Sequence, residues 1–218
     1  MPVYTIFPDA GSKYNYAAKP QDGDFKQVYP AGFEFDPHSN DPAAARNMIR
    51  QPDRTYVRKL FVSQGLPVTP DHLPSKVKID GPKRSLTDFL MSHSVFLVSS
   101  RFRSVVEELE PNRHQFIPVD LIWRDGSPAG VFFWFYPCAR VDCMDREATT
   151  HTFIERIGLW KYVSDGKYVV NLDQVGNHQV WIDQRLTAFD YPFVSAAFRA
   201  AADKAGLKGV GYNELPAV

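Results

Sequence analysis

The sequence predicts an α+β fold, in which a mixed and largely antiparallel sheet carries a few packed helices and one strand–helix–strand unit is duplicated. Segments with the apolar pattern of strands outnumber those with the pattern of helices. Asp-Gly pairs at 125–126 and 165–166 each separate two strand-like segments, where they favour hairpins. Adjacent hairpins predict antiparallel pairing and argue against a doubly wound parallel sheet.

Length and composition are those of an ordinary globular protein. The 218 residues are enough for one large domain or two closely packed halves with a substantial core. Hydrophobic residues make up 44% and charged residues 23%. The chain has 25 basic and 25 acidic side chains, so its net charge is zero. A nucleic-acid-binding protein needs a basic excess to contact phosphates, and we therefore expect no nucleic-acid partner.

The N-terminal sequence indicates the compartment. MPVYTIFPDAGSKYNY lacks the basic start and the continuous apolar run of a secretory signal. No stretch approaches the ~20 apolar residues that a membrane-spanning helix needs. We therefore expect a cytoplasmic protein with no membrane partner. In a reducing cytoplasm, Cys138 and Cys143 are expected to be free thiols, and a disulfide between them is the alternative.

Residues 1–60 are polar, aromatic and turn-rich, and we expect them to pack as a segment on a main domain formed by residues 61–218. Asp41 can cap a helix that has Pro42 at its first position and that stops at Pro52. The sequence therefore predicts one helix in this segment.

The next part of the chain is predicted to form two strands and a short helix. Residues 54–63 alternate like a strand, and residues 76–80, KVKID, form a second short strand within a loop rich in Pro and Gly. Residues 85–93, SLTDFLMSH, have the pattern of a short helix that begins at a serine cap.

The duplicated unit is a strand, a capped amphipathic helix and a returning strand. In the first copy, VFLVS at 95–99 leads into a helix that stops at Pro111, and QFIPVDLIW at 115–123 returns as a strand. In the second copy, PFVS at 192–195 leads into a helix that Gly206 can end, and GVGYNEL returns. Apolar residues stand at i, i+3, i+4 and i+7 in both helices: Phe102, Val105, Val106 and Leu109, and Phe198, Ala201, Ala202 and Ala205.

The two copies align without a gap at a constant offset of 96 residues. The offset matches Val98 with Val194, Ser99 with Ser195, Phe102 with Phe198, Arg103 with Arg199 and Phe116 with Tyr212. We interpret the match as a duplication and expect both phenylalanines to be buried. The alternative is that any strand followed by a capped helix and a strand looks alike.

Between the copies the chain is predicted to be mostly β. DLIW and VFFWFY flank the first Asp-Gly pair, and WKYVS and KYVVNL flank the second. HQVWID, which begins at residue 178, is one further strand. Residues 150–158 are predicted to form one or two helical turns that end at Gly158.

The sequence shows no group of residues that is typical of catalysis or metal binding. Ser99 lies between a strand and a helix, but LVSSR lacks the glycines of a nucleophile elbow, so a helix cap is the preferred interpretation. His151 and Glu155 could share a helix face, but two ligands of different type do not make a metal site. We therefore expect no enzyme activity, no metal and no cofactor.

One charged segment, residues 139–151, directly follows VFFWFY, the most apolar strand-like stretch. It is either a solvated loop that caps the next helix or a recognition loop braced by the sheet. On the second interpretation we assign part of a partner-binding surface to this loop, with an aromatic anchor close by. The assigned residues are Arg140, Asp142, Asp145, Arg146 and Glu147, with Trp160 as the anchor.

The order of these segments resembles immunity family eleven of polymorphic toxin systems. LVSSRF and FVSAAF match a strand-to-helix motif that the family carries twice, VDCMDREAT matches a segment between the copies, and GLKGVGY matches the closing motif. The resemblance covers roughly residues 60–215.

This resemblance implies a cytoplasmic immunity protein in competition between bacteria. Such a protein is encoded beside a toxin and neutralises it by stoichiometric binding and occlusion, so the expected partner is a cognate toxin domain. Two alternatives stay open: a non-catalytic interaction or regulatory module with the same fold, and an enzyme of unrecognised type. Zero net charge is mild evidence against a nuclease as the toxin, because inhibitors of nucleases gain from an acidic face.

Overall fold

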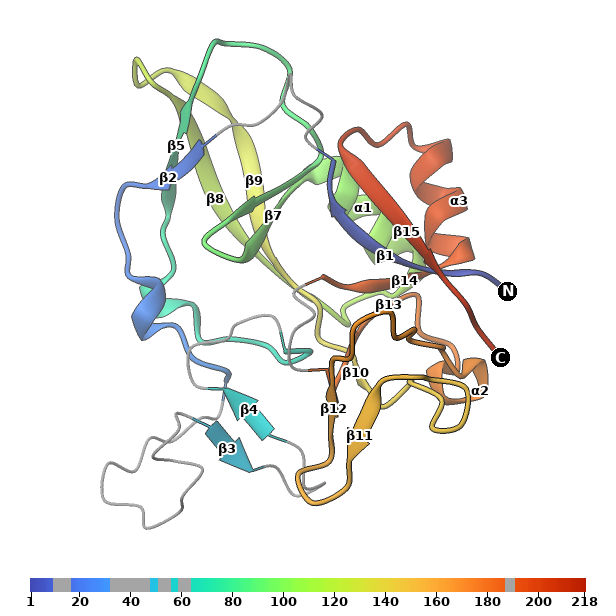
Figure 1. Cartoon of the computed structure of the whole chain (residues 1–218). Helices are drawn as coiled ribbons and strands as arrows, with labels where there is room; N and C mark the ends of the chain where they lie inside the picture. The colour runs from blue at the N-terminus through green and yellow to red at the C-terminus, as the bar shows by residue number, and fades with distance from the viewer. Residues whose placement is uncertain (10–16, 32–47, 51–55, 59–63, 187–190) are drawn as a thin grey trace, which may run out of the picture.

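The structure is a computed structural model, and it describes residues 1–9, 17–31, 48–50, 56–58, 64–186 and 191–218 (Figure 1). The described elements confirm the α+β class, with a mixed and largely antiparallel arrangement of strands. Within these ranges the helices are α1 (Ser100–Leu109), α2 (Leu172–Val175) and α3 (Ala196–Lys204), with short 3-10 helices at Phe25–Gln27 and Pro70–His72.

Two larger sheets organise the protein. The first has the strand order β2-β5-β8-β9-β7-β6, and the second has the order β10-β13-β14-β1-β15. The first contains β2 (Ala17–Pro20), β5 (Lys76–Asp80), β6 (Phe89–Ser92), β7 (Val95–Ser99), β8 (Gln115–Trp123) and β9 (Pro128–Tyr136). The second contains β1 (Val3–Pro8), β10 (Arg140–Val141), β13 (Val180–Asp183), β14 (Phe193–Ser195) and β15 (Val210–Leu215).

Two short hairpins complete the described strands. They are β3 (Met48–Arg50) with β4 (Tyr56–Arg58), and β11 (Thr152–Ile154) with β12 (Leu159–Lys161). Figure 1 shows both hairpins at the end of the molecule that lies away from the turn between β8 and β9.

The duplicated unit is confirmed, and the equivalence extends beyond the sequence match. In each copy the two strands of the unit run parallel to each other, because both pair antiparallel with one strand between them, β9 or β1. Phe132 of β9 pairs with Ser99 on one side and Val119 on the other. Val3 of β1 pairs with Ser195 and Leu215, which are the same two positions shifted by 96.

Each helix of the duplicated unit begins at a serine cap. The backbone of Ser99 (φ −74°, ψ 166°) is nearly identical to that of Ser195 (φ −77°, ψ 166°). The Ser99 hydroxyl accepts from the Phe102 amide at 3.2 Å, and the Ser195 hydroxyl accepts from the Phe198 amide at 3.1 Å. The cap interpretation of Ser99 is therefore confirmed. Gly206 follows α3 with φ +64°, the left-handed conformation expected of it.

Contacts beyond the regular strand pairing connect the two edges of each sheet, so that each sheet forms a ring. In the first ring, defined as β2-β5-β8-β9-β7-β6, the Ser92 hydroxyl donates to the Ala18 carbonyl at 2.8 Å and joins β6 to β2. In the second ring, β13-β14-β1-β15 continues through a parallel bridge between Ala217 and Val170 and an antiparallel bridge between Val170 and Met144, which leads back to β10 and β13.

Three apolar clusters fill the fold. One lies inside the first ring, one lies inside the second ring, and the third lies between the rings together with α1 and α3, which pack against each other. Alternate residues of β9 show the division, because Trp134 belongs to the first cluster and Phe133 and Phe135 belong to the shared one. Phe102 and Phe198 are both fully buried in the shared cluster, as predicted.

Several predicted elements are wrong, and pairing with the next strand along the chain is the reason in each case. Residues 85–93 do not form a helix, because Phe89–Ser92 is β6, which pairs with β7. Residues 150–158 do not form helical turns, because Thr152–Ile154 is β11 and the chain reverses at Gly158 (φ +64°) into β12. The hairpin around 165–166 is also absent, since β12 pairs with β11 instead.

The predicted helix after Asp41 falls mostly outside the described residues. Met48–Arg50, at its end, is strand β3, so the helical prediction is wrong there. Of the strand predicted at 54–63, the described part, Tyr56–Arg58, is strand β4. The strands at 76–80, 95–99 and 115–123, and the hairpin at Asp125-Gly126, are confirmed.

The N-terminal strand is part of the second sheet. β1 lies between β14 and β15, so it is an interior strand of that sheet (Figure 1). The division of the chain near residue 60 stays a prediction.

Cys138 and Cys143 are free thiols, as predicted. None of the helices in the described ranges is long and apolar enough to span a membrane.

Candidate partner-binding surface

The charged segment that the sequence singled out begins an insertion in the second ring. Residues 145–169 leave the ring after Met144 and return to it at Val170, and they include the β11–β12 hairpin. Two backbone hydrogen bonds close the base of this insertion, from the Asp145 amide to the Val169 carbonyl at 2.8 Å and from the Thr150 amide to the Lys167 carbonyl at 3.0 Å. In the first ring the equivalent connection, between β2 and β5, spans residues 21–75.

Asp145 fixes the first turn of the insertion. Its carboxylate accepts from the amides of Ala148 (2.8 Å) and Glu147 (3.0 Å) and from the side-chain amide of Asn171 (3.0 Å). The hydrogen bond from Ala148, followed by those from Asn171 and Glu147, lowers the pKa of Asp145. Asp145 therefore caps backbone amides, as one of the two interpretations expected, while the Glu147 side chain is exposed beside it.

Asp142 and Arg146 form an ion pair that a second arginine extends. The Arg146 Nη2 lies 2.8 and 2.9 Å from the two carboxylate oxygens of Asp142. Arg185 donates its Nε to Asp142 at 2.8 Å and its Nη1 to the carbonyl of Gly158 at 3.2 Å. This network ties the insertion's first turn to the tip of the β11–β12 hairpin.

The guanidinium of Arg146 covers an aromatic pair. Its Cζ lies 3.8 Å from the ring centroid of Phe153 and 5.2 Å from that of Trp160, and these two rings lie 5.0 Å apart. Trp160 is only 3% exposed, and its Nε1 has no hydrogen-bond partner among the described residues. In this conformation Arg146, rather than the indole, faces solvent.

Arg140 holds a different part of the second ring. It lies in β10, half-buried, and its guanidinium donates to the carbonyls of Gln64 at 2.8 Å and Gln184 at 3.5 Å. Gly65 approaches so closely that an added Cβ would lie 2.8 Å from the Cβ of Arg140. Of the six predicted residues, the structure thus joins Asp142, Arg146 and Trp160 directly and places Asp145 and Glu147 in the same turn.

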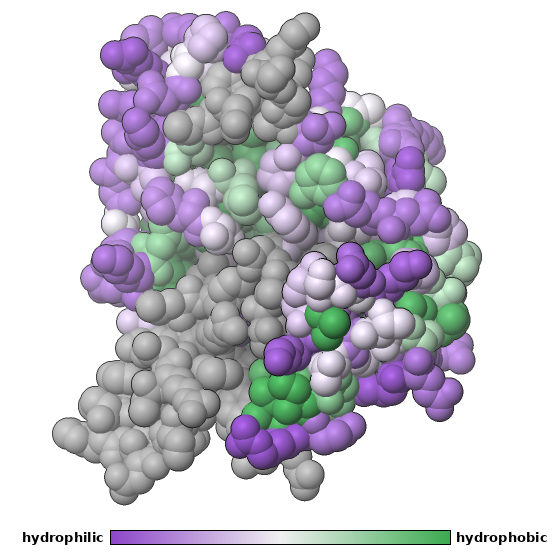
Figure 2. All heavy atoms as spheres, viewed as in Figure 1, coloured by the Kyte–Doolittle hydropathy of each residue, from purple (hydrophilic) through white to green (hydrophobic). Residues whose placement is uncertain are grey.

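The structure adds two surface residues that the sequence reasoning missed. Tyr162 is 67% exposed and Val163 is 38% exposed, directly after β12. The apolar pattern of WKYVS predicts a strand in a hairpin, and that prediction does not indicate the exposure of this pair. The available signal was the position of two apolar residues beside the Asp165-Gly166 turn. Figure 2 shows hydrophobic residues over the β11–β12 hairpin with hydrophilic residues around them.

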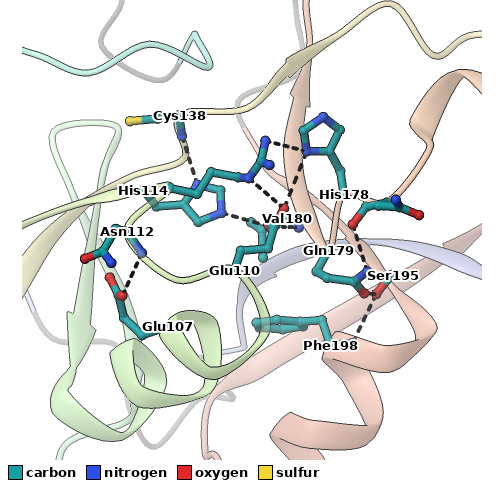
Figure 3. A network of polar contacts seen from close by, with 12 residues as sticks. Glu107, Glu110, Asn112, His114, Cys138, His178, Gln179, Val180, Ser195 and Phe198 are labelled. Carbon is teal, nitrogen blue, oxygen red and sulfur yellow. Dashed lines mark hydrogen bonds and ion pairs between the residues drawn. The ribbon is translucent and has the colours of Figure 1, made fainter.

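The most enzyme-like group in the described structure lies elsewhere, at the end of α1 (Figure 3). His114 Nε2 lies 2.9 Å from a carboxylate oxygen of Glu110, which also accepts from the Val180 amide at 2.9 Å. The Nδ1 of His114 accepts from the Cys138 amide at 3.0 Å, so Nε2 carries the proton. Both ring nitrogens are thus engaged, and none is available as a base.

The charges around Glu110 also indicate a structural role. Burial raises the pKa of Glu110, but the hydrogen bonds from His114 and Val180 outweigh burial and lower it overall. Burial raises the pKa of the nearby Cys138 thiol to about 11, so this thiol is not an activated nucleophile. The group joins the end of α1 to the start of β13, across the two rings. The described residues contain no cluster of three or more metal-ligating side chains.

The chain matches a known protein family. The model of the immunity protein family Imm11 matches residues 11–216, nearly the whole chain. No curated protein matches the chain.

Proposed function

Because the chain belongs to the immunity protein family Imm11, we propose that it neutralises a cognate bacterial toxin in the cytoplasm by stoichiometric binding and occlusion. The family match over residues 11–216 is the observation that carries this proposal. The proposed partner is a toxin domain, and the proposed action is to cover the surface through which that domain acts.

We place the partner-binding surface on the 145–169 insertion and the adjoining end of β10. The duplicated rings are similar in pairing and register, whereas this insertion adds the β11–β12 hairpin, and Arg146 within it forms an ion pair with Asp142. Binding residues often lie on loops that a rigid scaffold positions. The insertion therefore suits recognition of one partner without any change in the common core.

The chemistry of this surface also supports the proposal. Arg146 is partly exposed above Phe153, and arginine and aromatic residues contribute most of the affinity in many protein interfaces. Asp142 and Arg185 hold Arg146 and the hairpin in place, so less conformational entropy is lost on binding. A tight inhibitor buries roughly 1,600 Å² in total, and we expect the insertion to supply the centre of such an area.

Co-expression with the toxin domain encoded beside the gene tests the proposal. We expect cells to survive, the two proteins to co-purify, and titration calorimetry of the purified partners to give a 1:1 complex. Survival without a complex, or protection by far less than one equivalent, would indicate an enzyme that modifies the toxin or its target. Loss of viability in spite of soluble immunity protein would contradict neutralisation.

A further inference from the structure

We infer that Tyr162 is the aromatic anchor of the interface and that it inserts into an apolar pocket with an acidic rim on the toxin. This inference rests on the proposed function and names the chemistry of the partner at that surface. It also replaces Trp160, the anchor expected from the sequence, with the residue two positions further along the chain.

The exposure of Tyr162 separates it from the other aromatic residues described. Among the described residues the large hydrophobic side chains that are exposed are Met1, Met91, Val131, Tyr162, Val163 and Val218. Two of these lie at the chain ends, and Met91 and Val131 are isolated in sequence, whereas Tyr162 and Val163 are adjacent. Single exposed apolar residues are normal, but an exposed pair with a tyrosine has the composition of an interface hot spot.

His151 contacts the loop that carries Tyr162, residues 161–167, and restricts its conformation. The ring centroids of Tyr162 and His151 lie 5.2 Å apart, and the ring centroids of Tyr168 and His151 lie 3.9 Å apart. The Val163 amide donates to His151 Nδ1 at 3.1 Å. His151 itself is only 5% exposed, so it acts as a buried support for an exposed side chain.

Backbone contacts restrict the same loop further. The Gly166 amide donates to the Val163 carbonyl at 3.1 Å, and the Lys167 amide donates to the Thr150 hydroxyl at 2.7 Å. A Cβ on Gly166 would lie 2.3 Å from His151 Nδ1, so only glycine allows this approach. A loop that is already ordered loses little conformational entropy when it binds, which favours Tyr162 as an anchor.

The side chains beside Tyr162 specify the partner's chemistry. A tyrosine ring is apolar with a polar tip, so its receptor needs an apolar wall and a hydrogen-bonding group at depth. Lys161 and Lys167 are exposed at the two ends of the loop, and Asp165 is its one acidic residue, which leaves a net charge of +1 (2 − 1). Complementarity therefore requires carboxylates around the rim of the pocket.

Titration of the toxin domain with matched variants tests the inference. We expect Tyr162→Ala to weaken binding by roughly 30-fold or more, as hot-spot truncations do, with an unchanged melting temperature. Val131→Ala removes a side chain of similar exposure on β9 and should leave the affinity unchanged. Tyr162→Phe should weaken binding, but less than Tyr162→Ala, because it keeps the ring and leaves the hydrogen-bonding group of the pocket without a partner.

Gly166→Ala provides a test that leaves Tyr162 itself intact. The added methyl group would displace His151 and with it the loop, so we expect a loss of affinity together with a modest loss of stability. Higher salt should slow association in the wild type and have less effect in a Lys161→Ala, Lys167→Ala variant.

The results distinguish this inference from the proposed function. If wild type binds the toxin and Tyr162→Ala binds equally well, the anchor is elsewhere and neutralisation still stands. If wild type does not bind the toxin at all, the proposed function fails and the anchor fails with it. Weaker binding by Tyr162→Ala but equally weaker binding by Val131→Ala would overturn the assignment of the pocket to this loop.

Discussion

Arg103 and Arg199, which are 96 residues apart in sequence, stack on equivalent pairs of aromatic rings in the two halves of the protein. Each arginine is the fourth residue of its helix. Each guanidinium covers one ring from the returning strand and one ring from the strand between the two copies. The distances from Cζ to the ring centroids are 5.6 Å to Phe116 and 4.8 Å to Phe133 for Arg103, and 5.1 Å to Tyr212 and 4.6 Å to Tyr4 for Arg199.

This equivalence extends the duplication to side-chain contacts outside the aligned segments. Phe133 pairs with Val98 in the first ring, and Tyr4 pairs with Val194 in the second, so the two intervening strands carry their aromatic residues at the same register. A chance likeness between two strand–helix–strand units would not reproduce contacts to strands that lie outside those units. The helical interface between the rings is therefore expected to respond in the same way to matched substitutions in either copy.

The first prediction concerns the two phenylalanines where the copies meet. The rings of Phe102 and Phe198 are fully buried, with centroids 5.7 Å apart. We expect Phe102→Ala and Phe198→Ala each to lower the free energy of unfolding by about 3–5 kcal/mol, because each leaves a cavity in the shared cluster. Because the rings are in contact, the double variant should not show the sum of the two losses. Urea unfolding of all four proteins measures this, and a loss below about 1 kcal/mol would contradict the packing.

The sequence could predict these units because their signals are local. Serine caps, apolar spacing and a terminal glycine lie within one segment, so the sequence predicts the roles of Ser99, Phe102 and Gly206, and the structure confirms them. β6 and β11 could not be assigned in the same way. Their hairpin partners β7 and β12 make them strands, and the residue pattern within 85–93 or 150–158 alone does not show that pairing.

The candidate surface was less predictable for the same reason. The charge pattern identified the segment that contains Asp142 and Arg146, and the structure does join these residues. The burial of Trp160 depends on Arg146 and the hairpin around it, which are tertiary contacts. The exposure of Tyr162 depends on a loop that rests on His151, eleven residues away in sequence. Such contacts cannot be read from the spacing of residues along the chain.

The second prediction separates recognition from stability at the turn of the insertion. Asp145→Ala removes the acceptor for two amides and for Asn171, so we expect a lower melting temperature. Arg146→Ala removes an exposed guanidinium, and we expect weaker toxin binding with a smaller change in stability. Arg124→Ala, a basic residue at the turn between β8 and β9, is the charge-matched control. Unchanged affinity for both variants would remove this turn from the interface.

The third prediction concerns the pH dependence of stability at His151. Burial lowers the pKa of His151 from its ordinary value of 6.5. The unfolded chain therefore binds a proton more readily than the folded one, and the stability that neutral His151 provides is lost as pH falls below about 6.5. We expect a His151→Phe variant to show a flatter dependence of melting temperature on pH between 7.5 and 5.

A control at a solvent-exposed histidine makes this measurement specific. His72 is exposed, and His72→Gln is the matched control for the loss of one histidine. Equal slopes in all three proteins would show that His151 titrates alike in the folded and unfolded chains. That result would contradict its role as a neutral support for the Val163 amide.

The fourth prediction concerns the two thiols. Burial raises the pKa of Cys138 to about 11, and burial followed by the charge of Asp183 raises that of Cys143 well above its ordinary range. At pH 8 both are therefore protonated and poorly reactive. We expect slow reaction with a thiol reagent in the native protein and rapid reaction of two thiols in the unfolded one, without added reductant. A Cys138→Ser variant should give one, and no reaction after unfolding would indicate a disulfide.

The last prediction addresses Glu110, which connects the two rings. Its carboxylate is almost fully buried, and one of its oxygens accepts from His114 Nε2 and from the Val180 amide. The Nε of Arg113 lies 3.2 Å from the other oxygen. Glu110→Gln keeps the shape but removes the charge, and we expect a loss of about 1.5–3 kcal/mol, the usual worth of hydrogen bonds to a charged group. Glu110→Ala leaves buried donors without an acceptor and should cost more.

The pH profile of the same variants tests the cause of that loss. The pKa of Glu110 is lowered in the folded protein from an ordinary value of 4.5, so its contribution is present above that pH and is lost as pH falls through the lower, folded value. Glu110→Gln should therefore approach the wild type in stability under acid, whereas the exposed control Glu108→Gln should match it throughout. If Glu110 served catalysis instead, Glu110→Gln would abolish protection against the toxin while the protein stayed folded. We expect the folded variant to protect, because Glu110 and His114 lie apart from the 145–169 insertion in sequence and use their polar atoms to hold α1 against β13.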